Sequence, residues 1–287
     1  MHAEGRWGGE PNPTQDARVT RLMQGVTRDK KKQDRASSNA RRLTHIDLTP
    51  THLSEIRPLV MVRGAPPNDI MKYAAACVAT YGLLRISELI GSAQHTDRHL
   101  AVSQITFYDR EHKEVPVLGY REKQRVPARF TIRFGETKTD QAGGNTSKQI
   151  AAEPAVHALW TWMNHRRMLS QQNQAERKPA SSPHLWMNPA DQNPSTLKPV
   201  LMRKDSLFRF LEQWLEVIGY PDASITGKSF RRGGASALIE SGAARPDVQG
   251  AGGWASASMM DVYSSEAAKL ARTLKVSAGM APAAASL

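Results

Sequence analysis

The sequence has a single cysteine among 287 residues, and the absence of a second thiol excludes an intrachain disulfide. It has no run of about 18 apolar residues, so no segment is expected to cross a membrane. The first 19 residues lack the apolar stretch of a secretory signal. These absences favour an intracellular, reducing compartment, which would be nuclear in a eukaryote and cytoplasmic or nucleoid-associated in a prokaryote.

The sequence also has fewer acidic than basic residues. The 39 Lys and Arg outnumber the 27 Asp and Glu, which gives a net charge of +12 and a pI near 10.0. Such a field attracts polyanions, of which nucleic acid is the commonest inside a cell. A basic protein that is merely soluble is the alternative, and charge alone does not choose between the two.

The charge is concentrated at the N-terminus, where residues 1–45 hold ten Lys or Arg against five Asp or Glu. This composition predicts a basic N-terminal segment and linker, with a short helix over Ala17–Val26. The linker could lie along phosphates or form a disordered tail. Residues 46–287 form the second predicted region, where 40% hydrophobic content in the chain allows a real core.

Within the second region, apolar periodicity predicts mostly helices. The predicted helices are Thr49–Arg57, Asp69–Ile90 capped by Asn68, Ala155–Ser170, Arg203–Ile218, Ser229–Ser241 and the pieces after Pro246. Alternating residues predict strands over AVSQITFY and ARFTIRF, with SKQIAAE as a partner strand, and residues 179–199 predict a loop. The expected class is mainly α with a small antiparallel β-sheet (α+β).

The most informative stretch is residues 225–263. Lys228 and Arg231 form a K-x-x-R pattern, Trp254 ends a GGW triplet 23 residues later, and Tyr263 follows nine residues further on. Upstream, GLLRISELI supplies Arg85 and Glu88 as R-x-x-E, and GETKT supplies Lys138. Each of these residues alone has an ordinary structural explanation, and it is their joint spacing that is specific.

These motifs resemble the catalytic core of tyrosine recombinases, the phage-integrase family, in its Cre-like version. The resemblance covers about residues 45–270 and fills all six principal positions: Arg85, Lys138, Lys228, Arg231, Trp254 and Tyr263. It implies the recombinase catalytic-domain fold and strand cleavage through a covalent 3′-phosphotyrosyl intermediate, with double-stranded DNA as partner. The KSFRRGGAS and GGWAS segments look closest to crypton- or DIRS-type mobile elements.

Physical chemistry supports these roles. Tyr263 would be the nucleophile, Arg85 and Arg231 would grip phosphate oxygens, and Trp254 would donate to an oxygen. A lysine whose pKa is lowered by nearby arginines can protonate the leaving 5′ oxygen, and Lys138 is the predicted acid. Glu88 is expected to orient its neighbours. No metal-ligand cluster or phosphate-binding glycine loop is evident, so we expect cofactor-free, metal- and ATP-independent chemistry.

Two departures from the family pattern stand out. Position 228 is lysine where histidine is commoner, so Lys228 is interpreted as an electrostatic contact and the base for Tyr263 stays unassigned. Asp109–Pro127 is an enlarged basic loop. Contacts to the DNA backbone are predicted for Arg129, Arg133 and Arg232.

The resemblance further implies a dimer to tetramer on paired DNA sites. Ala267, Leu270, Ala271 and Leu274 share one face of a predicted tail helix that would dock on a neighbouring protomer or on its own domain. Full-length members of the family have an N-terminal helical clamp domain, so the resemblance implies that this chain is either a fragment or a reduced, element-borne enzyme. Two alternatives stay open: a catalytically silent DNA-binding protein and type IB topoisomerase-like strand relaxation.

Overall fold

The computed structural model describes residues 44–91, 99–117, 127–134, 147–175, 183–192 and 199–256, with Ser258 and Met260. The helices are α2 (Pro50–Val60), α3 (Pro67–Tyr81), α4 (Ile86–Leu89), α5 (Glu153–Ala175), α6 (Lys204–Val217), α7 (Ser229–Glu240) and α8 (Arg245–Gly252), with a 3₁₀ turn over Val102–Gln104. The strands are β1 (Thr44–His45), β2 (Ile105–Tyr108), β3 (Arg129–Arg133), β4 (Ser147–Ile150), β5 (Met187–Gln192), β6 (Pro199–Leu201) and β7 (Ala223–Ser224). The predicted class, mainly helical with a small antiparallel sheet, is confirmed.

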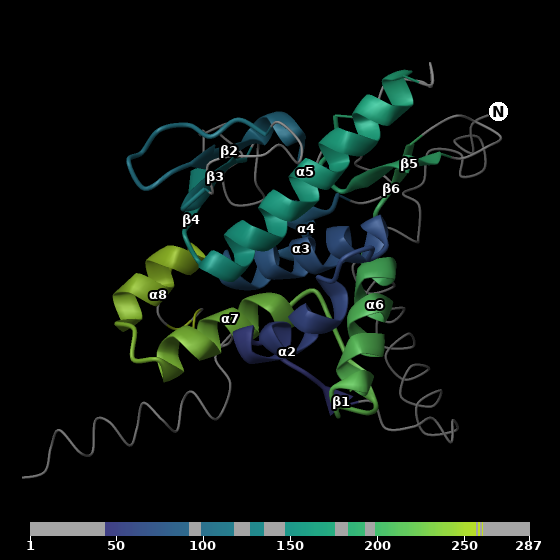
Figure 1. Ribbon diagram of the computed structural model, residues 1–287. Coiled ribbons are helices and arrows are strands. Elements are labelled where there is room, and N and C mark those ends of the chain that lie inside the picture. Colours follow the sequence, from purple (N-terminus) through teal and green to yellow (C-terminus); the bar gives the residue numbers. More distant parts are fainter. Residues whose placement is uncertain are drawn as a thin grey trace, which may run out of the picture. The chain divides into compact units, whose positions relative to one another are not determined.

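Helix α3 lies at the centre of the core. Nearly every residue from Ile70 to Thr80 is buried, because apolar and small side chains cover all sides of the helix. Helices α2, α5, α6 and α7 all contact it, and Figure 1 shows α5 along one side and α7 on the other. The hydroxyl of Tyr73 donates to the Leu53 carbonyl at 2.9 Å, which ties α3 to α2.

Helix α7 approaches α3 closely because it carries two glycines. A Cβ at Gly233 would lie 2.0 Å from the Leu48 carbonyl oxygen, and one at Gly234 would lie 2.2 Å from the Thr80 carbonyl oxygen. Both atoms are backbone, so neither could move aside for a side chain. The glycine pair therefore fixes how deeply α7 packs, and with it the positions of Arg231 and Arg232, which precede the pair.

The three-stranded sheet has the order β2-β3-β4, antiparallel throughout. Phe130 and Ile132 are fully buried, whereas Arg129 and Thr131 are half-buried and Arg133 is exposed, so the predicted alternation of β3 is confirmed. Phe107 pairs with Phe130 on the inner face and packs its ring edge-to-face on Trp160 of α5 at 4.9 Å. The sheet is therefore held against α5.

Three details of the sequence prediction are wrong. The helix expected over Asp69–Ile90 is two helices separated by residues 82–85, and α3 begins at Pro67 with Pro66, not Asn68, as its N-cap. The loop expected over residues 179–199 contains β5 and the start of β6. Two-residue strands β1 and β7 pair in parallel, where no strand was expected. Such short strands carry too few residues for a period to be visible.

Candidate active site

The turn between α3 and α4 is the centre of the candidate site. Leu83 has a φ of 49°, which is unusual for a residue with a side chain and costs about 1 kcal/mol. Its backbone N–H donates to Thr80, and the next N–H, of Leu84, donates to Ala79. The turn ends the helix and leaves the Leu83 carbonyl oxygen pointing away from α3 toward α7.

Arg231 of α7 fills the space beside this carbonyl. Its Nη1 donates to the Leu83 oxygen at 3.1 Å, and its Nη2 donates to the carbonyl oxygen of Gly252 at the end of α8. The side chain is almost completely buried, at 2% exposed. The guanidinium thus joins the α3–α4 turn, α7 and α8.

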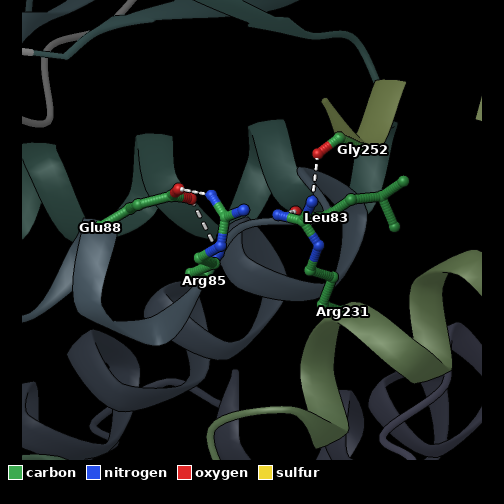
Figure 2. A network of polar contacts seen from close by, with 5 residues as sticks. All are labelled: Leu83, Arg85, Glu88, Arg231 and Gly252. Atoms are coloured by element: carbon green, nitrogen blue, oxygen red, sulfur yellow. Dashed lines mark hydrogen bonds and ion pairs between the residues drawn. The ribbon is translucent and has the colours of Figure 1, made fainter. Parts of the chain in front are cut away.

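Arg85 lies on the same turn, immediately before α4. Its backbone N–H and its Nη1 each donate to a carboxylate oxygen of Glu88 at 2.8 Å, so Glu88 both caps α4 and orients the guanidinium. The Arg85 side chain keeps 29% of its surface exposed. In Figure 2 the guanidinium groups of Arg85 and Arg231 point toward one another. The structure therefore brings together two of the predicted phosphate ligands and the predicted orienting glutamate.

Trp254 covers the other side of Arg231. The indole ring lies 4.3 Å from the guanidinium carbon, in a cation–π arrangement, and is 4% exposed. Gly253, with a φ of 64°, turns the chain back after α8, and the indole lies so close to Gly252 that a Cβ there would be 1.8 Å from the ring. Leu83 and Met260 belong to the same small buried cluster as Trp254.

Lys228 lies at the N-terminus of α7 and is exposed. A Cβ on the preceding Gly227 would lie 2.8 Å from Ile86, the residue after Arg85, so the segment leading to Lys228 packs against the start of α4. Arg85 and Lys228 are thus carried by backbone segments in contact. This placement agrees with an electrostatic contact from the edge of the site.

The structure adds Lys148 of β4, which the sequence analysis did not select. Burial, followed by the charge of Arg231, lowers its pKa to about 8; Glu88 raises it and Arg85 lowers it further. Lys148 therefore lies within electrostatic range of both arginines. A signal was present in the sequence, because the predicted strand SKQIAAE places Lys148 on the same face as the apolar Ile150.

Lys138 and Tyr263 lie outside the described residues, as do the predicted tail helix and the basic segment 1–43. Met260, three residues before Tyr263, is fully buried, and its backbone N–H donates to the Ser256 oxygen. The roles of Lys138 and Tyr263, and the division into 1–45 and 46–287, stay predictions.

The three arginines predicted to contact the DNA backbone differ in their surroundings. Arg133 is exposed on the outer face of the sheet, with a bond to Thr106 at 3.2 Å. Arg129 stacks over the Tyr108 ring and contacts His112. Arg232 forms an ion pair with Asp47 at 3.3 Å, which links α7 to the segment after β1.

A pocket of about 590 Å³ lies elsewhere, between the sheet and α5, and Asp109, Glu111, His157 and Trp160 contribute to its lining. No predicted site residue with a described position lines it. Among the described residues, no group of three or more His, Cys, Asp or Glu is arranged to hold a metal ion. No helix in the described ranges is long and apolar enough to span a bilayer.

No protein-family model and no curated protein matches the chain. The solved structures that it resembles include XerA recombinase, at 15% identity and a TM-score of 0.46, covering 80% of this chain and 65% of that one. A XerH site-specific recombinase bound to palindromic difH substrate has 13% identity, a TM-score of 0.49 and coverages of 84% and 54%. The Tn1549 transposon integrase in complex with transposon right end DNA has 16% identity and a TM-score of 0.40. The match covers 84% of this chain and 68% of that one.

These neighbours are tyrosine recombinases, as the sequence motifs predicted. The chain spans between about half and two thirds of their length.

Proposed function

We propose that the protein is a site-specific DNA recombinase that cleaves and rejoins strands through a phosphotyrosyl intermediate on Tyr263. One observation carries the proposal: the guanidiniums of Arg85 and Arg231 point toward one another, and Lys148 lies within electrostatic range of both. Of the two arginines, Arg85 is the one that Glu88 holds. Like charges repel, and a partly buried group of them is costly unless it serves to bind an anion. A phosphodiester in its cleavage transition state supplies that anion.

The arrangement suits phosphoryl transfer to a phenol. Arg85, partly exposed and oriented by Glu88, would bind one non-bridging oxygen bidentately. Arg231 would supply the second guanidinium, and its three anchors hold it before DNA arrives, so little reorganisation is needed as charge develops. Lys228 would contact phosphate from the edge of the site.

The reaction balances without any further group. The Tyr263 oxygen forms a bond to phosphorus while the bond from phosphorus to the 5′ oxygen breaks, and the phenolic proton passes to solvent or to a base. The departing 5′ oxygen takes the electron pair and a proton from the acid, predicted to be Lys138, which gives a 5′ hydroxyl and a neutral amine. Reversal with the 5′ hydroxyl of another strand rejoins the DNA, so the bond energy is conserved in the phosphotyrosine.

Double-stranded DNA is the proposed partner. The net charge of +12 and the exposed Arg133 on the outer face of the sheet support a backbone-binding surface. We expect binding to weaken steeply with salt because each neutralised phosphate releases counterions. Assembly as a dimer or tetramer on paired sites belongs to the same proposal, and the predicted tail helix would hold neighbouring protomers together.

Covalent trapping tests the proposal. Wild type and Tyr263→Phe are incubated at low salt with nicked, labelled fragments of the DNA that flanks the gene, and adducts that resist SDS are counted. An adduct with wild type alone supports the reaction and its nucleophile. Binding without an adduct would favour a silent DNA-binding protein, and relaxation of supercoiled DNA of any sequence would favour a topoisomerase-like activity.

A further inference from the structure

The end of α8 encloses Arg231 on two sides. The carbonyl oxygen of Gly252 accepts a hydrogen bond from Nη2 of the guanidinium (Figure 2), and the indole of Trp254 lies 4.3 Å from the guanidinium carbon. The two groups belong to neighbouring parts of one short turn, so both depend on the backbone that ends α8. A change in this turn would move the carbonyl and the ring together.

Gln249 fixes this turn through both its backbone and its side chain. Its carbonyl oxygen accepts the backbone N–H of Trp254 at 3.1 Å, and the N–H of Gly253 donates to the Gly250 carbonyl at 2.9 Å. With Gly253 at a φ of 64°, these bonds form a Schellman ending, which any residue at position 249 could support. The side-chain bond is more specific, because Nε2 of Gln249 donates to the Trp254 carbonyl oxygen at 3.1 Å. It requires a donor of the right length at position 249.

The side-chain bond restrains a residue that lies beyond the helix. A carbonyl group at the end of a helix has no partner within the helix and is ordinarily left to water. Here the same residue binds both backbone polar groups of Trp254. Trp254 therefore leaves the turn in a fixed direction, with only 4% of its surface exposed and its ring on Arg231.

Resting on the proposed function, we infer that Gln249 is a positioning residue for strand cleavage. Its amide fixes Trp254, and Trp254 together with the Gly252 carbonyl fixes the Arg231 guanidinium where charge develops on the phosphate oxygens. A misplacement of about 1 Å in such a site can cost about 100-fold in rate. The alternative is that the bond only stabilises the end of α8, and the two roles predict different kinetics.

Single-turnover trapping separates the two roles. Wild type and Gln249→Met are mixed with saturating nicked, labelled DNA, and the rate constant and the final amount of adduct are measured separately. Methionine is similar to glutamine in length but has no donor, so the bond to Trp254 is lost. We expect the rate constant to fall about 10- to 100-fold, because Arg231 is displaced in every molecule. A purely structural role would reduce the folded fraction, and with it the amount of adduct, at an unchanged rate constant.

Gln104→Met is the matched control. The Gln104 side chain donates to the Arg133 carbonyl at 2.9 Å and accepts the N–H of Ala101 at 2.7 Å, so this substitution also removes side-chain bonds to the backbone, but in the turn before β2. Both variants should lose roughly 2–4 °C in Tm, and Gln104→Met should keep the wild-type rate constant. Equal loss of rate in the two variants, or a wild-type rate constant in Gln249→Met, would overturn the inference.

A spectroscopic signature tests the contact without any reaction. With ¹⁵N-labelled tryptophan the six indole N–H groups give separate signals, and Trp254→Leu identifies the signal of Trp254 by its loss. Gln249→Met should shift or broaden that signal and Gln104→Met should leave it in place, whereas an unmoved signal in Gln249→Met would contradict the inference. Wild type that forms no adduct would refute the proposed function, and the indole signal would then decide whether Gln249 positions Trp254.

Discussion

A methyl group added at Gly252 should disturb the site through the Trp254 ring, without replacing any predicted catalytic residue. In Gly252→Ala the new Cβ would lie 1.8 to 2.5 Å from three carbons of the Trp254 ring. The ring has little room to retreat, because it is 4% exposed and packs in a cluster with Leu83 and Met260. The indole must therefore shift off the guanidinium of Arg231.

The expected cost combines three effects. Overpacking costs about 1–3 kcal/mol, and loss of the cation–π contact costs about 0.5–2 kcal/mol. Alanine regains about 1 kcal/mol of helix propensity at the end of α8. The net loss is about 2 kcal/mol, which for a domain of this size lowers Tm by roughly 4–8 °C. Adduct formation should fall by about 100-fold, because Arg231 loses the Trp254 ring as one of its three anchors and small displacements are expensive in a preorganised site.

Gly250→Ala is the matched control, since it lies on the same helix and its Cβ would meet no atom within 4 Å. It should raise Tm by about 2 °C through helix propensity and leave activity unchanged. Thermal unfolding followed by circular dichroism, together with the trapping assay, measures both effects. Equal behaviour of the two variants would refute the reasoning, because it would mean that the close packing of Trp254 on Gly252 does not position Arg231.

Two further predictions concern buried titratable groups away from the site. Cys77 is fully buried on α3 and burial raises the pKa of its thiol to about 12, so N-ethylmaleimide should label it only after unfolding; rapid labelling of the native protein would contradict this. His99 is 6% exposed, and burial, then His184 and Lys204, lower its pKa below the usual 6.5. Because the unfolded chain then binds a proton more readily, stability should fall as the pH drops below about 6.5, and urea unfolding should show a smaller fall in His99→Gln.

Sequence reasoning succeeded where a pattern repeats over many residues. The alternation around Phe130 and Ile132 predicted a strand with one buried face, and the structure has that face against α5. The motif spacing selected Arg231 and Trp254 together, and the two side chains are in contact in the structure. In each case several residues carried the same signal, so single exceptions did not matter.

The sequence could not predict the break after Tyr81, because GLLRISELI continues the helical period without a proline. The break depends on contacts with residues far along the chain. Gly82 has no side chain and so leaves room for the Ile150 side chain of β4. Leu83 adopts an unfavourable φ, and its carbonyl oxygen accepts a hydrogen bond from Arg231. Tertiary contacts of this kind override local propensity.

The break also explains why Arg85 can serve as a ligand. In a continuous helix the backbone N–H of Arg85 would bond to the carbonyl four residues earlier, and its side chain would lie along the helix surface. Outside the helix, the N–H is free to bond to Glu88, and the same carboxylate then holds the guanidinium toward Arg231. The strained backbone at Leu83 is therefore part of the candidate site, because the same turn places Arg85 before α4 and binds Arg231 through the Leu83 carbonyl.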